Sequence, residues 1–149
     1  MQRSLVGSEM CIRDRYAIAA NHDISIDGPL TKDKFMATLA QANDNMNQKH
    51  IYYAFTPKKG FRVICLDSII DYKLTANGEI SNEEFMWLKE ELDEHPKDTI
   101  IVCTHVPIIE PYSSSNHKML NEYEVRKLLK THKNPLIVLQ GHYHAVMFL

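Results

Sequence analysis

Residues 99–105, TIIVCTH, and residues 136–144, LIVLQGHYH, decide the fold. Each begins with a short apolar run that does not alternate with polar residues. This is the pattern of a strand that is buried on both faces of a parallel sheet. Between them, residues 121–130 carry apolar side chains at helical spacing. Strand, helix and strand in this order predict an α/β fold with a largely parallel sheet covered by helices.

The remaining elements follow from the same periodicities. In chain order they are a buried strand at 16–20, a helix at 31–47, two hairpin strands at 51–55 and 61–67, and a helix at 81–94. The chain has 149 residues, of which 44% are hydrophobic. This length and composition suit one domain with its own core. We place that domain at residues 16–149.

Three helix starts carry capping residues. Thr31 and Asn121 stand where a side-chain oxygen can accept a hydrogen bond from the first helical turn. Ser81 and Glu84 form an S-x-x-E capping box, in which each side chain is expected to bond the backbone N–H of the other residue.

The composition argues against several classes of partner. Seventeen basic and nineteen acidic residues give a net charge of -2, which disfavours nucleic acid as a partner. No apolar run approaches the ~20 residues that cross a membrane. Cys65 and Cys103 lie inside apolar runs and form no C-x-x-C pair, so we expect buried free thiols. This favours a reducing compartment such as the cytoplasm.

Residues 1–15, MQRSLVGSEMCIRDR, have no clear period and join the strand-like YAIAA abruptly. They resemble translated sequencing-adapter read-through, and a foreign segment of this kind would not be part of the fold. The alternative is a disordered N-terminal segment. We expect the native protein to begin upstream and the chain to be a fragment.

Histidines follow three of the predicted strands. Asn21-His22-Asp23 follows the first, His105 follows residues 99–104, and Gly141-His142-Tyr143-His144 follows residues 136–140. Because parallel sheets place their sites beyond the carboxyl ends of the strands, we expect these side chains to converge. An extended His-x-His pair would present both rings on one face, and Gly141 would permit a sharp turn. Imidazoles gathered in this way are typical of a metal site.

The other histidines have a simpler interpretation as solvated surface residues: His50, His95, His117 and His132. His117 is the least certain of them, because the loop after His105 could fold over the site.

The motifs NHD, THVP and GHYH, in this order, resemble the later motifs of the calcineurin-like metallophosphoesterases. The segment between the first two, with its LDS and its helix carrying WL, also resembles that family. The resemblance covers residues 16–149. It implies a sandwich of mixed β-sheets flanked by helices, and hydrolysis of phosphate mono- or diesters at a site with two divalent or trivalent metal ions (Mn, Fe, Zn or Ni).

The resemblance also implies roles for single residues. Asn21, His105 and His142 would bind the second metal ion, and His144 the first. His22 would be the catalytic histidine near the leaving-group oxygen, and Asp23 would orient it. Metal-activated hydroxide would attack phosphorus in line. Ala20 stands where the family usually has glycine.

The family pattern begins with a D-x-H motif and a G-D-x-x-D motif, and neither precedes Asn21. In the family these motifs supply the remaining ligands, one of which bridges both ions. We therefore expect the chain as given to lack a complete binuclear site and to be inactive. His144 would be almost the only ligand of the first metal ion.

Three other interpretations stay open. A non-catalytic interaction module on the same fold would have no need of His22. A nuclease of the same superfamily is disfavoured by the near-neutral charge. A metal hydrolase on another α/β fold would have to explain Asn21 before His22. The favoured partner is a small phosphate ester, whose identity the sequence does not specify.

Overall fold

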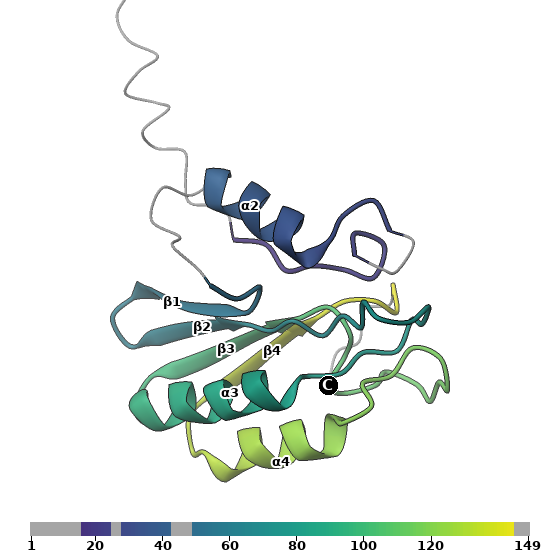
Figure 1. The fold of residues 1–149 in the computed structure, drawn as a ribbon. Coiled ribbons are helices and arrows are strands. Elements are labelled where there is room, and N and C mark those ends of the chain that lie inside the picture. The colour runs from purple at the N-terminus through teal and green to yellow at the C-terminus, as the bar shows by residue number, and fades with distance from the viewer. Residues whose placement is uncertain (1–15, 25–27, 43–48, 145–149) are drawn as a thin grey trace, which may run out of the picture.

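The structure, a computed structural model, describes residues 16–24, 28–42 and 49–144. Within these ranges the elements are α2 (Lys32–Ala42), β1 (Tyr53–Lys58), β2 (Phe61–Cys65), α3 (Asn82–Glu94), β3 (Thr99–Thr104), α4 (Glu122–Thr131) and β4 (Leu136–Gln140). The strands form one sheet in the order β1-β2-β3-β4 (Figure 1). β1 and β2 are antiparallel, while β2, β3 and β4 are parallel. The prediction of a largely parallel sheet is confirmed.

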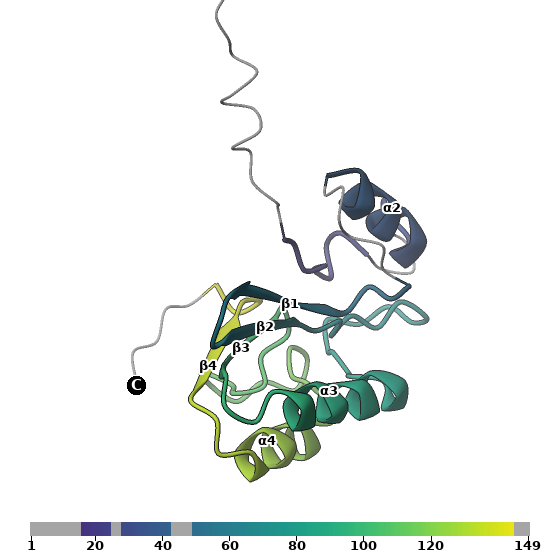
Figure 2. The ribbon, with the colours of Figure 1, turned by 90° about the vertical axis from the view of Figure 1, so that its left-hand side faces the viewer.

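The helices lie on both sides of the sheet. α3 and α4 cover one face, and α2 lies on the other side (Figures 1 and 2). The main core joins the covered face to Leu88 of α3 and Val125 of α4. Side chains on this face of β3 are completely buried, as Ile100 and Val102 show. Most of the apolar burial that stabilises the domain is therefore on this side of the sheet.

α2 is attached to the sheet in two ways. Leu39 packs in a smaller cluster with Tyr53 and Cys65. At the other end of the helix, Lys32 Nζ lies 2.7 Å from the buried carboxylate of Asp67 and donates a hydrogen bond to the carbonyl of Ile69 at 2.9 Å. The helix begins where expected, since Thr31 Oγ1 accepts a hydrogen bond from the N–H of Lys34. Residues 43–47 of the predicted helix lie outside the described residues.

The prediction of a strand at residues 16–20 is wrong. This segment pairs with no strand among the described residues. Its backbone is held by single hydrogen bonds instead: the Tyr53 hydroxyl donates to the carbonyl of Ala17 at 2.9 Å, and the N–H of Ala20 donates to Asp23. The apolar run indicated burial, but only Ala19 is fully buried.

β4 was expected to be buried on both faces, and this is also wrong. Ile137 and Leu139 are 47% and 55% exposed. β4 is the edge of the sheet, and α2, the helix on this side, packs against Tyr53 of β1 and Cys65 of β2 and not against Ile137 or Leu139. The sequence pattern reports the apolar character of a strand, but it does not say whether another element lies against it.

Two of the residues in the three capping signals, Glu84 and Asn121, bond partners that differ from those expected. Ser81 caps α3 by accepting from the N–H of Glu84 at 3.1 Å. The Glu84 carboxylate does not complete the box, because it accepts from the N–H of Asp67 at 2.8 Å. Asn121 makes no cap bond in α4, and its amide bonds both backbone groups of Ile80 instead. Both side chains thus join separate segments of the chain.

Among the helices of the described residues, none has the length and apolar character needed to cross a membrane.

Candidate active site

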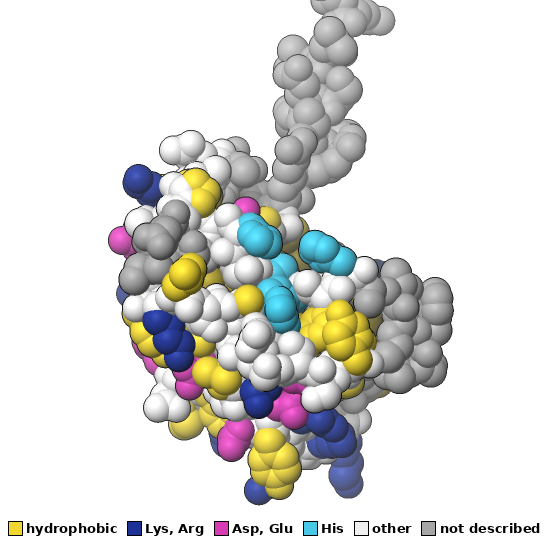
Figure 3. All heavy atoms as spheres, turned by 90° about the vertical axis from the view of Figure 1, so that its right-hand side faces the viewer, with side chains coloured by type: hydrophobic (Ala, Val, Ile, Leu, Met, Phe, Trp, Pro, Cys, Tyr) yellow, Lys and Arg dark blue, Asp and Glu magenta, His cyan; other side chains and the backbone are white. Residues whose placement is uncertain are grey.

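Three segments meet at the carboxyl edge of the parallel strands. His105 Nε2 lies 2.9 Å from Asn21 Oδ1 and 3.0 Å from His142 Nδ1. Asn21 comes from the segment before α2, His105 directly follows β3, and His142 follows β4. Figure 3 shows histidine side chains gathered on this face of the molecule. The predicted convergence of the strand ends is therefore present, although residues 16–20 are not a strand.

A tight turn holds Asn21 and His22. The carbonyl of Ala20 accepts hydrogen bonds from the N–H groups of Asp23 and Ile24, both at 3.0 Å. Asp23 Oδ2 closes the turn from the other side by accepting the N–H of Ala20 at 3.0 Å. His22 is exposed at the tip of this turn. The structure thus gives the Asp23 carboxylate a backbone partner, and its predicted contact with His22 stays a prediction.

The segment after β4 is not extended, so the expected geometry of the His-x-His pair is wrong. His142 and His144 have φ angles of 73° and 50°, in the left-handed region that residues other than glycine rarely adopt. Gly141 does not take this conformation; its N–H donates to the carbonyl of His105 at 3.2 Å. The turn is therefore made by the two histidines. Such backbone conformations are concentrated at functional sites.

The environment keeps the two inner imidazoles neutral. Burial and the neighbouring His142 together lower the pKa of His105 to about 4, while Asp23 opposes the shift. Burial also lowers the pKa of His142, to which the nearby His117 contributes. Neutral imidazole is the form that binds a metal ion, because its ring nitrogen then has a free lone pair.

His144 and His22 lie at the margin of this group. Both side chains are exposed. Both are close enough to lower the pKa of His105 electrostatically. The structure thus brings the six predicted site residues to one edge of the sheet: Asn21, His22, Asp23, His105, His142 and His144.

Sequence reasoning left His117 and Tyr112 outside the site, and the structure brings both to it. The ring of His117 lies 5.1 Å from that of His142, and Tyr112 meets the ring of Tyr143 edge-on at 4.8 Å. Gln140 helps to position the loop, since its amide bonds both backbone groups of Ile109. In the sequence, the feature that indicates these two residues is the long loop after His105 in which they lie, because loops often carry binding residues.

The donor atoms present fit one metal ion better than two. Two neutral imidazoles and an amide oxygen suit Zn, Fe or Mn. The His142 nitrogen that faces His105 is Nδ1, whereas its Nε2 atom is buried on the other side of the ring, which is near the backbone of Ala76. However, no group of three or more His, Cys, Asp or Glu side chains in the described ranges is placed to hold a metal ion. The carboxylate ligands of a two-metal site are therefore not among the described residues.

Comparison with known proteins identifies the family. The chain matches the calcineurin-like phosphoesterase family over residues 4–146. It belongs to this family. The mixed sheet of four strands flanked by helices is consistent with the calcineurin-like fold. Members of the family are phosphoester hydrolases that generally use divalent metal ions.

One curated relative is the "Uncharacterized protein YvnB" of Bacillus subtilis (strain 168), which is 25% identical over 134 residues. The match covers 87% of this chain but 10% of the relative. The chain therefore spans about a tenth of the relative's length. Residues 1–15 lie outside the described residues, so the predicted division after residue 15 stays a prediction.

Proposed function

We propose that the chain is part of a metal-dependent phosphoesterase that hydrolyses mono- or diesters of phosphate with a small-molecule substrate. The convergence of Asn21, His105 and His142 is the observation that carries this proposal. These three residues would hold one divalent ion. When bound, the ion polarises phosphoryl oxygens and lowers the pKa of a coordinated water.

The chain's own residues have distinct tasks in this proposal. His22 is exposed beside Asn21, where an imidazole can deliver a proton to the leaving-group oxygen. A positioned general acid of this kind contributes ~10²–10⁴-fold to the rate. Asp23 acts on His22 through the backbone, because its carboxylate closes the turn that presents the histidine. His144 would serve the other ion of a two-metal site, in which further ligands must come from outside the described residues.

Two consequences follow for the chain as given. Its described residues would hold one ion, and with one ion it would hydrolyse phosphate esters far more slowly than a complete two-metal enzyme. The free thiols Cys65 and Cys103 favour a reducing compartment such as the cytoplasm.

Metal binding tests the proposed ligand set. Titration of the chain with Mn²⁺, followed by calorimetry, is expected to show one site. His105→Ala should weaken that site at least ~10-fold, as loss of a metal ligand or its support does. His95→Ala is the matched control, because His95 is a half-buried histidine that pairs with Asp98 at the end of α3. Equal affinities for the two variants would contradict the ligand assignment.

Catalysis is tested separately in the full-length gene product, with p-nitrophenyl phosphate and bis-p-nitrophenyl phosphate as substrates. His22→Ala should lower kcat by ~10²-fold or more and leave the Mn²⁺ affinity unchanged. An unchanged kcat would remove the catalytic role of His22. No activity in the unmodified full-length protein would favour the non-catalytic interaction module. Tight, salt-dependent binding of DNA would favour the nuclease.

A further inference from the structure

A row of side chains crosses all four strands on the face away from α3 and α4. Tyr53 of β1 is the register partner of Cys65 in β2, which is the partner of Cys103 in β3, which is the partner of Leu139 in β4. The two cysteines therefore stand opposite each other on neighbouring parallel strands. Both are free thiols. The row runs from a buried tyrosine to an exposed leucine, so access to the thiols is from the side of Leu139.

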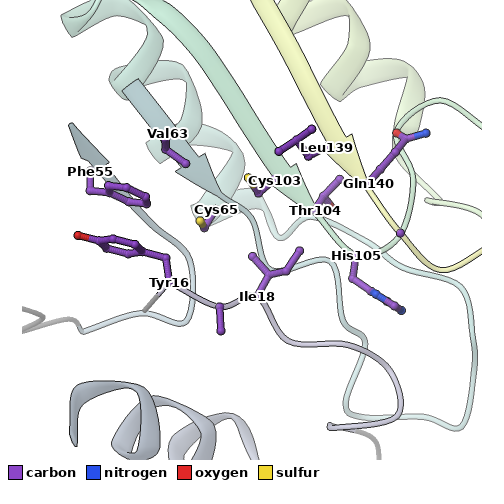
Figure 4. A pocket seen from close by; sticks show the side chains of 12 residues that line it. Tyr16, Ile18, Phe55, Val63, Cys65, Cys103, Thr104, His105, Leu139 and Gln140 are labelled. Atoms are coloured by element: carbon purple, nitrogen blue, oxygen red, sulfur yellow. The ribbon is translucent and has the colours of Figure 1, made fainter. Parts of the chain in front are cut away.

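Both thiols line a cavity of about 360 Å³ (Figure 4). Its other walls are mainly apolar: Tyr16, Ile18, Phe55 and Val63 on one side, and Leu139 on the other. The ring of His105 forms one end of the cavity. The cavity is distinct from the histidine group but adjoins it. Cys103 is partly exposed, whereas Cys65 is 3% exposed. A small solute that enters the cavity therefore reaches Cys103 first.

The spacing of the two thiols suits a covalent bond between them. They are register partners on adjacent parallel strands, so their side chains lie on the same face of the sheet. Neighbouring strands lie about 4.8 Å apart. This separation falls within the roughly 4.4–6.8 Å found between the Cα atoms of disulfide-bonded cysteines. No large backbone movement is needed to bring the sulfur atoms together.

We propose that Cys65 and Cys103 form an oxidation site, in which a hydroperoxide that enters the cavity converts the two thiols into a disulfide between β2 and β3. The inference is independent of the proposed phosphoesterase activity, because it rests on the register of the two strands and on the cavity that both thiols line.

The chemistry proceeds in two balanced steps. The Cys103 sulfur attacks one oxygen of hydrogen peroxide, the O–O bond breaks, and water leaves with the thiol proton, giving a sulfenic acid. The Cys65 sulfur then attacks the Cys103 sulfur, the S–O bond breaks, and hydroxide leaves with the Cys65 proton as a second water. Two thiols lose two electrons in total, and one peroxide is reduced to two waters.

The test is peroxide treatment of the Cys11→Ser chain, which retains only the two thiols in question. Intact mass should fall by about 2 Da, as expected for loss of two hydrogens, and dithiothreitol should restore it. Digestion should yield one peptide pair joined through Cys65 and Cys103. The reaction requires no variant of either cysteine, so it does not depend on how such a variant folds.

Two further variants in the Cys11→Ser background test the order of the steps. With Cys65→Ser, Cys103 should be trapped by dimedone as a sulfenic acid. With Cys103→Ser, Cys65 should stay unreacted until urea unfolds the chain. Several outcomes would overturn the proposal: an oxidised Cys103 that persists without a disulfide while Cys65 is intact, a disulfide only between two chains, or two free thiols that react with peroxide only in urea.

Discussion

The two faces of the sheet are built from similar apolar residues but differ in what covers them. On the face toward α3 and α4, Ile100 and Val102 are completely buried. On the other face, Ile137 and Leu139 are about half exposed. The cysteine pair and the cavity beside His105 belong to the open face. The comparison indicates that the covered face supplies stability, whereas the open face and its carboxyl edge carry the groups with chemistry.

The largest expected effect tests where stability resides. Leu88→Ala removes a fully buried side chain from α3 and should lower the free energy of unfolding by about 2–5 kcal/mol. Leu139→Ala is the matched change on the open face, and it should cost about 0.5 kcal/mol or less. Urea unfolding followed by circular dichroism measures both. Similar losses from the two variants would mean that Leu139 is covered in solution and that the faces do not differ in this way.

The next effect concerns Glu84 of α3, an acidic residue whose side chain is fully buried. Burial raises its pKa to about 9, so the folded chain retains a proton that the unfolded chain releases near pH 4.5. The free energy of unfolding should therefore fall as the pH rises from about 5 to 9. Glu84→Gln, which stays neutral, should flatten this dependence and be more stable than the unmodified chain at pH 8.5 by about 1–3 kcal/mol.

Glu83→Gln is the control for this measurement, because Glu83 is an exposed acid in the same helical turn. It should leave the pH dependence of urea unfolding as it is in the unmodified chain. If Glu83→Gln and Glu84→Gln gave the same pH profile, the buried carboxyl would not be the source of the slope.

The smallest expected effect concerns the turn that follows β4. His144 adopts φ 50°, which strains any residue with a β-carbon. His144→Gly should be more stable than His144→Ala by about 1 kcal/mol, because only glycine adopts this conformation without strain. Thermal unfolding of the two variants gives the difference. A more stable alanine variant would show that the left-handed turn after β4 is not kept in solution.

Local patterns predicted the elements well, because a helix or strand is specified by residues close together in sequence. The hairpin at β1 and β2 and the order β3, α4, β4 followed from periodicity alone. The proximity of His105 and His142 also followed, since neighbouring parallel strands end at the same edge. The expectation of buried thiols is confirmed for Cys65, whereas Cys103 is partly exposed.

The misses have a common cause, which is that they depend on contacts between distant segments. Glu84 had a capping residue three positions away, yet it bonds Asp67, seventeen residues before it. The approach of His117 depends on the path of a long loop, which has no period. The exposure of β4 depends on what covers it. The left-handed backbone at His142 and His144 has no signal in a pair of histidines.

The mode of attachment of α2 has a consequence for local unfolding. The helix is joined to the rest by a small apolar cluster around Leu39, by Phe35, which is partly buried against the main core, and by the polar contacts of Lys32 with Asp67 and Ile69. An element with so few attachments opens at a lower free energy than the whole domain. Tyr53 and Cys65 lie under it in the same cluster. Opening of α2 would therefore expose these two side chains and let the amide hydrogens of the helix itself exchange, whereas those of Ile100 and Val102 in the sheet would exchange only on global unfolding.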